Sequence, residues 1–135
     1  MFVIDASVAL SWCFLDEEST AADEALGRLA RDDAVAPSIW ALEVANGLRT
    51  AERRGRLGLA DLPRVRALLL ALPVQVEAVE LGAALGAVTE IARSLDLTTY
   101  GAAYLELAAR RRVPLATVDE RLRRAAVVAG VALVG

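Results

Sequence analysis

Two aspartates stand at the ends of short apolar segments, where packing alone does not explain a charged side chain. Asp5 follows the apolar residues 2–4, and Asp119 follows residues 115–118. Short runs rich in branched and aromatic residues favour buried strands. Parallel strands deliver their carboxyl ends to one edge of a sheet, so we expect these two carboxylates to meet there although they are far apart in the sequence.

A third acid and a hydroxyl extend this set. A buried carboxylate without a partner is costly, so Asp5 needs a metal ion, a cation, a helix start or water beside it. Ser7 can hold that carboxylate with its hydroxyl or cap a following helix. Glu43 lies about one turn into a predicted helix. Three carboxylates in one pocket repel one another without a cation, and carboxylates suit Mg²⁺ or Mn²⁺. Two strand-end acids and one acid from a helix would therefore form a pocket that favours a divalent cation.

Each acid also has an ordinary structural explanation. Asp5 can shape a turn, and Asp119 can cap the helix that follows it. Glutamates such as Glu43 are common on exposed helix faces, and short motifs of this kind are weakly specific. The metal-site interpretation therefore depends on whether the fold brings the three residues together.

Two missing residue types narrow the chemistry further. The chain has no His, which excludes Ser-His-Asp triads, Cys-His pairs and His-ligated zinc sites. It also has no Lys, since all 15 positive charges are Arg, and this excludes the phosphate-loop lysine of ordinary nucleotide triphosphatases. A single Cys13 rules out an internal disulfide and favours a reducing, cytoplasmic setting. Carboxylates, hydroxyls and arginines remain as the chemical groups.

The overall composition predicts one domain over residues 1–135. The chain is 56% hydrophobic but only 4% aromatic, with a net charge of −3. Its mean hydropathy of +0.45 suggests that a partner covers part of the surface. No apolar run is long enough for a membrane span, and a secretory signal is not expected. We expect an apolar groove for a partner peptide between the second and third helices, over residues 38–72.

Strand-like and helical segments alternate along the chain, which indicates a parallel sheet covered by helices. Pro37 and Ser38 are expected to open the long helix that carries Glu43, with Ser38 as its N-cap. The predicted strands are residues 2–4, 34–36, 74–79, 115–118 and a small closing strand, 131–134. The predicted helices are a segment beginning near residue 20, the long helix from residue 38, and residues 59–72, 81–95, 100–112 and 120–129.

Four segments together resemble the PIN-domain ribonucleases, most closely the VapC-like toxins of bacterial toxin–antitoxin pairs. They are Val-Ile-Asp-Ala-Ser-Val at 3–8, Ala-Leu-Glu-Val-Ala-Asn at 41–46, Leu-Thr-Thr-Tyr-Gly-Ala-Ala-Tyr-Leu at 97–105 and Leu-Ala-Thr-Val-Asp at 115–119. They follow the family's order from end to end. The resemblance implies a PIN-like α/β/α sandwich with a central, mainly parallel sheet.

The same resemblance implies a function and partners. Asp5, Glu43 and Asp119 match acids that cluster around one or two Mg²⁺ or Mn²⁺ ions, where a metal-activated water cleaves RNA. A small VapB-like antitoxin and homodimer formation are also implied. One position departs from the pattern, because Gly101 stands where the family normally has an aspartate.

Two functions therefore remain open at this point. The first is a metal-dependent endoribonuclease toxin, weakened or inactivated at Gly101, with Arg49 and Arg53 as candidate contacts to RNA phosphates. The second is a non-catalytic pseudo-nuclease that keeps the antitoxin and dimer surfaces. An acid-rich phosphatase is a weaker third possibility, because the segment 5–7 lacks the second aspartate that such enzymes place two residues after the first.

Overall fold

The computed structural model describes residues 1–135 and contains one sheet of four parallel strands in the order β3-β2-β1-β4. The strands are β1 (Phe2–Ile4), β2 (Ala34–Pro37), β3 (Val74–Glu77) and β4 (Leu115–Ala116). The helices are α1 (Ala6–Ser11), α2 (Thr20–Leu29), α3 (Trp40–Arg53), α4 (Leu62–Leu70), α5 (Leu81–Ala83), α6 (Thr89–Leu95), α7 (Thr99–Arg111) and α8 (Glu120–Val128), with short helical turns η1 (Leu59–Asp61) and η2 (Ala84–Val88).

Strand β1 divides the core because its side chains alternate between the two faces of the sheet. Val3 packs into a cluster with Tyr104 and Leu107 of α7 and Leu122 of α8. The neighbouring side chains of β1 point the other way and pack with α1 and α2, in a cluster that includes Phe2, Ile4, Val8, Ala22 and Ala25. Helices therefore cover both faces, and the predicted α/β/α sandwich with a parallel sheet is confirmed.

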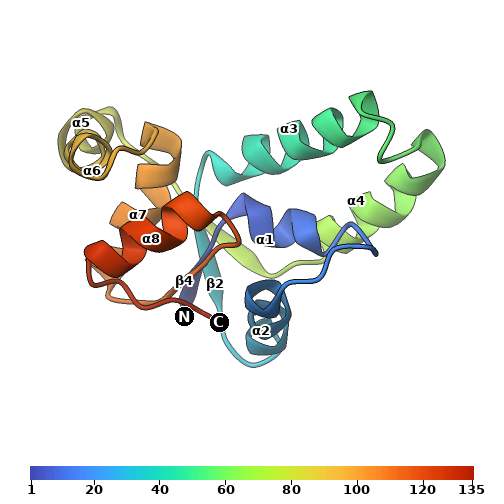
Figure 1. Cartoon of the computed structure of the whole chain (residues 1–135), viewed down its shortest axis with the longest axis horizontal. Helices are drawn as coiled ribbons and strands as arrows, with labels where there is room; N and C mark the ends of the chain where they lie inside the picture. The colour runs from blue at the N-terminus through green and yellow to red at the C-terminus, as the bar shows by residue number, and fades with distance from the viewer.

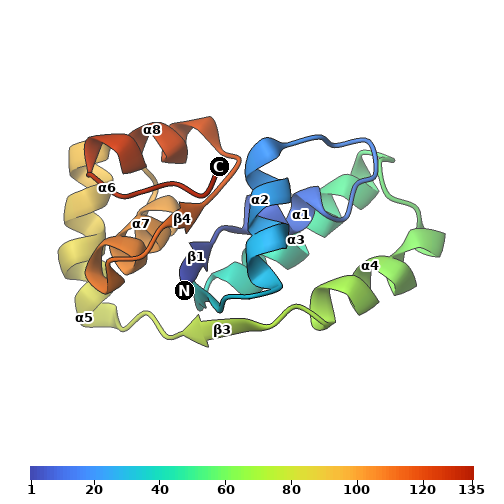
Figure 2. The ribbon, with the colours of Figure 1, turned by 90° about the horizontal axis from the view of Figure 1, so that it is seen from below.

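The helices form two groups, one on each side of the sheet. Figure 1 shows α1 to α4 on one side of the strands and α5 to α8 on the other. Seen from below, α3 and α4 extend away from the sheet as a helical hairpin (Figure 2). Cys13, Ala51, Leu57 and Val65 form a small core inside this hairpin. None of the helices combines the length and the apolar character that crossing a membrane requires.

A close contact between α1 and α3 fixes how Glu43 is presented. A Cβ atom at Gly47 would lie only 2.3 Å from Cδ1 of Leu10, so a side chain at residue 47 would require the Leu10 side chain to move. Helix α1 begins directly after Asp5, and α3 carries Glu43 one turn before Gly47. This contact therefore sets the distance between the elements that bear two of the candidate acids.

Several local predictions need correction. Ser38 does not cap α3: the helix begins at Trp40 after Ile39, and the Ser38 hydroxyl instead accepts the Val79 N–H at 3.3 Å. The predicted strand 131–134 is reduced to one bridge between Leu115 and Leu133. The predicted helix 81–95 exists but bends at Gly86, whose backbone has non-helical φ and ψ of −99° and −105°.

Candidate functional site

Asp5 lies at the carboxyl end of β1 and is only 8% exposed. Its Oδ2 accepts hydrogen bonds from the Ser7 and Thr117 hydroxyls, each at 2.7 Å. Burial raises the pKa of the Asp5 carboxyl and the charge of Asp119 adds to that rise, while the two hydroxyls oppose it. The carboxylate is thus held by neutral donors without an arginine partner.

The same two hydroxyls connect the end of β1 to the loop that leads into α8. Ser7 Oγ accepts the Val118 N–H at 3.1 Å, and Thr117 Oγ1 accepts the Asp119 N–H at 3.1 Å. Each hydroxyl therefore donates to Asp5 and accepts from the backbone beside Asp119. The expected supporting role of Ser7 as a donor to Asp5 agrees with this geometry.

Asp119 is the N-cap of α8 and is exposed. Its Oδ1 accepts the backbone N–H groups of Arg121 at 2.9 Å and Leu122 at 3.3 Å. Capping of this kind satisfies donors that the first turn of a helix leaves without partners. The capping role predicted as an alternative is therefore present, and it occupies one of the two carboxylate oxygens.

Glu43 comes from the first turn of α3 and turns towards the same region. Its Oε1 accepts a hydrogen bond of 2.5 Å from the hydroxyl of Tyr104, a residue of α7. Partial burial raises the pKa of the Glu43 carboxyl, and the charge of Asp5 raises it further. Burial and the bond to Glu43 also raise the pKa of the Tyr104 hydroxyl, so that group remains a proton donor.

Each of the three carboxylates accepts side-chain or capping hydrogen bonds through one oxygen, and the second oxygen is open in Glu43 and Asp119. Glu43 Oε2 and Asp119 Oδ2 accept no hydrogen bond, and Asp5 Oδ1 accepts none from a side chain, although the Ala6 N–H favours that carboxylate. None of the three acids forms an ion pair. Open carboxylate oxygens without a protein cation are the donors that Mg²⁺ and Mn²⁺ prefer.

The acids are close enough to influence one another but do not form a closed set of ligands. Asp5 raises the pKa of Glu43, and Asp119 raises that of Asp5. No three His, Cys, Asp or Glu side chains, however, are placed to share one metal ion. The donor chemistry therefore fits a divalent cation, while a complete coordination shell would need water or movement of these side chains.

Gly101 lies in the first turn of α7, as predicted. The Thr98 hydroxyl accepts the Gly101 N–H at 3.1 Å and thereby caps the helix. A Cβ atom at this position would meet only Thr98 Oγ1, at 3.6 Å, which is an ordinary contact. There is consequently room for a side chain where the glycine supplies none.

The two arginines expected to contact phosphates differ in their surroundings. Arg49 donates to Glu52 at 3.0 Å, so an acid of its own helix already partners it. Arg53 makes only a long contact of 3.5 Å with the Thr50 hydroxyl. Successive residues of α3 are rotated by about 100°, so Arg53 is about 80° and Arg49 about 120° away from Glu43 around the helix. Arg53 is the freer of the two cations.

An apolar hollow lies beside Glu43, away from the groove expected between α3 and α4. Its volume is about 310 Å³, and Leu42, Val79 and Val88 are among the residues that line it. A neighbouring hollow of about 360 Å³ is lined by Glu43 and Asn46 and shares Leu42 with the first. The apolar surface near the acids is thus formed by α3, η2 and α7.

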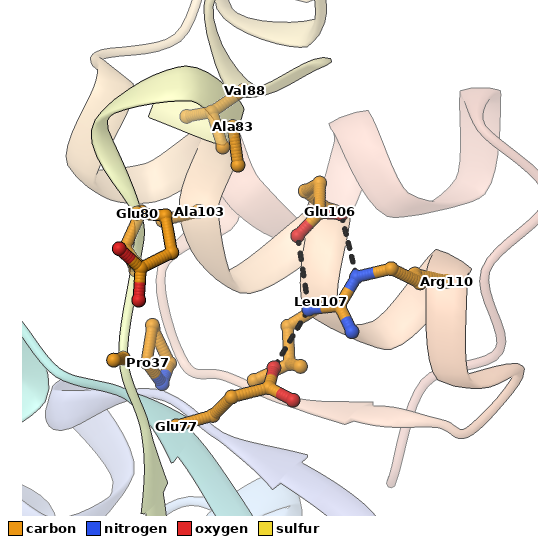
Figure 3. Close-up of a pocket in the computed structure, with 11 residues that line it drawn as sticks. Pro37, Glu77, Glu80, Ala83, Val88, Ala103, Glu106, Leu107 and Arg110 are labelled. Atoms are coloured by element: carbon orange, nitrogen blue, oxygen red, sulfur yellow. Dashed lines mark hydrogen bonds and ion pairs between the residues drawn. The ribbon is translucent and has the colours of Figure 1, made fainter. Parts of the chain in front are cut away.

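A second group of acids lies at the end of β3, where a hollow of about 250 Å³ opens between Glu77, Glu80, Glu106 and Arg110. Figure 3 shows the Arg110 guanidinium between Glu77 and Glu106. These contacts measure 2.7 Å and 2.8 Å, and Arg111 adds a second bond to Glu77 at 2.9 Å. Arginines of α7 therefore neutralise Glu77, in contrast to Asp5.

Sequence analysis did not identify two residues that hold the acids. Thr117 is fully buried within an apolar strand segment, and Tyr104 lies on the apolar face of α7. A buried hydroxyl usually needs a hydrogen-bond partner, so each residue carried a signal that some polar group lies opposite it. Their partners are 112 and 61 positions away, which is why the local pattern could not name them.

Comparison with known proteins agrees with this fold. The crystal structure of PAE2754 from Pyrobaculum aerophilum is similar, with a TM-score of 0.65 and 21% sequence identity over 92% of this chain and 84% of that chain. At this identity the likeness is one of fold. No curated protein matches the sequence. The family model of the PIN domain matches residues 2–128, and the chain therefore belongs to the PIN-domain family, whose members are typically metal-dependent nucleases.

Proposed function

We propose that this protein is a metal-dependent endoribonuclease and the VapC-like toxin of a toxin–antitoxin pair. Asp5, Glu43 and Asp119 would hold Mg²⁺ or Mn²⁺. The observation that carries the proposal is the shared state of these carboxylates, each held by hydrogen bonds from neutral donors of the protein and none in an ion pair. Without a cation, burial raises the pKa of both Asp5 and Glu43, and the charge of Asp119 adds to the rise at Asp5 as that of Asp5 does at Glu43.

In this proposal the protein's own residues orient the acids and the RNA. Ser7 and Thr117 direct the carboxylate of Asp5, and the first turn of α8 directs that of Asp119. Arg53, in the last turn of α3, would contact a phosphate of the bound strand. A divalent ion bound there would neutralise charge on the phosphodiester and lower the pKa of the attacking water.

We also propose a VapB-like antitoxin and a second copy of the chain as partners. The support is the apolar hollow beside Glu43 together with the exposed side chains around it. Leu42, Leu81 and Leu85 are each more than two-thirds exposed, although they are large and apolar. A helix or extended segment that covered them would also close access to Glu43.

The alternative, a pseudo-nuclease that binds the same partners without cleavage, rests on Gly101. This position supplies no carboxylate, and the remaining acids do not form a closed ligand set. Titration with Mn²⁺ and an RNA-cleavage assay separate the two functions, with Asp5→Asn as the inactive control. Metal-dependent cleavage that is lost in Asp5→Asn supports the nuclease, whereas partner binding without cleavage supports the alternative.

A further inference from the structure

Tyr104 connects α7 to the candidate metal site through Glu43. It is 1% exposed, and its hydroxyl donates to Glu43 Oε1 at 2.5 Å across 61 positions of sequence. Tyr104 lies one turn after Gly101, and residues at this spacing share one face of a helix. Since Gly101 has no side chain, the Tyr104 hydroxyl is the group that this face of α7 directs to the acids.

The tyrosine ring is fixed firmly enough to hold its partner. It packs in the main core with Val3, Val35 and Leu107. Its hydroxyl reaches the first turn of α3, where it meets Glu43 near the buried Asp5.

Glu43 would not be expected to remain in this position without help. It lines an open hollow and could extend into solvent. It is instead half-buried near Asp5, where two like charges repel each other. A short hydrogen bond from a buried donor opposes that repulsion, because bonds to charged groups are stronger than bonds between neutral ones.

We propose that Tyr104 is a positioning residue for metal binding: its hydroxyl fixes Glu43 beside Asp5 and leaves Oε2 as the one oxygen with which Glu43 binds the cation. This rests on the proposed function, since it assigns a role within the same site. Glu43 is then a ligand through a single oxygen. The chain keeps a contribution from α7 to the site although Gly101 provides no acid.

Two measurements test the role of Tyr104. The first uses the metal-free protein and a double-mutant cycle with Tyr104→Phe, Glu43→Leu, which removes the acceptor, and the double variant. Phenylalanine keeps the ring and removes only the hydroxyl. If the bond exists, the two substitutions are non-additive, and the coupling changes the unfolding equilibrium by about tenfold. Additive effects would overturn the proposed contact without reference to any metal.

The second measurement is Mn²⁺ binding by calorimetry. Loss of a residue that orients a metal ligand typically weakens affinity about 10- to 100-fold, and we expect a loss in this range for Tyr104→Phe. In a Glu43→Leu background, which has no acceptor for the Tyr104 hydroxyl, the same substitution should have no further effect. Tyr100→Phe is the matched control, because Tyr100 is on the same helix but 57% exposed, and it should keep the parent affinity.

The outcomes separate this inference from the function on which it rests. Equal Mn²⁺ affinity in the parent and Tyr104→Phe would overturn the positioning role and leave the metal site intact. The same loss in Tyr100→Phe would also overturn it. If the parent chain does not bind Mn²⁺ at millimolar concentration, the proposed metal site fails and the positioning role fails with it.

Discussion

Asp5 and Glu77 occupy comparable places in the sheet but have opposite surroundings. Asp5 follows β1, and Glu77 is the last residue of β3, so both lie at the carboxyl ends of parallel strands. Glu77 forms ion pairs with Arg110 and Arg111, as the close-up in Figure 3 shows for Arg110. Asp5 receives hydrogen bonds only from neutral groups.

This difference appears in the acidity of the two carboxyls. Burial raises the pKa of Asp5, whereas the hydrogen bond from Arg110, assisted by Arg111, lowers the pKa of Glu77. Where the protein provides its own cation, a strand-end acid contributes to folding and has no need of an added ion. Where it provides only hydroxyls, the charge remains uncompensated. Sites of the second kind are candidates for function.

The largest effect is expected when Asp5, the acid without an arginine partner, is neutralised. Asp5→Asn should reduce metal-dependent RNA cleavage by at least about a hundredfold, since metal ions contribute several kcal/mol to charge stabilisation. It should also raise the metal-free stability by on the order of 1 kcal/mol, as replacing a buried functional charge often does. Cleavage rates and urea melts measure the two effects. Unchanged cleavage would show that Asp5 is a structural residue like Glu77.

A second test adds a charge where the site lacks one. Gly101→Asp should increase the cleavage rate by at least about tenfold, which corresponds to ~1.36 kcal/mol of transition-state stabilisation. An acid in the first turn of α7 is also favoured by the helix dipole. The space at Gly101 is open, so the fold should be kept. Gly101→Asn controls for size without charge, and an equal rate in both variants would contradict the prediction.

The raised pKa of Asp5 predicts an unusual dependence of stability on pH. Its ordinary value is 3.8, so the unfolded chain loses this proton above about pH 4, while the folded protein retains it to higher pH. The folded state then binds more protons, and the contribution of Asp5 to the free energy of unfolding falls as pH rises through this window. Urea melts from pH 4 to 7 should show this decline in the parent relative to Asp5→Asn. Parallel curves would contradict the raised pKa.

Most strand and helix segments could be predicted from the sequence because their apolar spacing is local, whereas the shared role of the three acids stays a prediction. Alternating apolar segments predicted β1 and the helices, and the charged residue after a short strand identified Asp5. The closing strand was overestimated for a reason outside its own sequence. Strand β4 has only two residues, and of these only Leu115 forms a bridge with the closing segment, at Leu133.

The contacts that hold the site were not predictable in the same way. Ser38 has the residue type of a helix cap, yet the Val79 N–H, 41 positions away, takes its hydroxyl. The bond between Tyr104 and Glu43 likewise joins two helices whose relative placement depends on core packing. Residue type therefore indicated which groups could react or bond, but tertiary structure determined their partners.

The smallest effect is expected at Glu77, the acid that forms ion pairs with arginines. Glu77→Gln removes ion pairs in which the Glu77 and Arg110 side chains are 29% and 51% exposed. Exposed pairs of this kind contribute about 0.2–1 kcal/mol, so the loss of stability should remain below ~1 kcal/mol. Because the pKa of Glu77 is lowered, its contribution is present above the ordinary value of 4.5 and disappears as the pH falls through the lowered pKa. The stability difference between parent and variant should therefore be seen at pH 7 and vanish in strong acid.

Mn²⁺ affinity provides the decisive contrast for this variant. Arg110 would keep its bond to Glu106, so the local structure should survive the substitution. Glu77→Gln should then bind Mn²⁺ as the parent does, whereas Asp5→Asn should lose at least about tenfold in affinity. The two substitutions are chemically matched, each turning a strand-end carboxylate into an amide. If Glu77→Gln weakened Mn²⁺ binding as much as Asp5→Asn, the cation would depend on the general negative charge of this sheet edge, and the distinction between the two acids would be wrong.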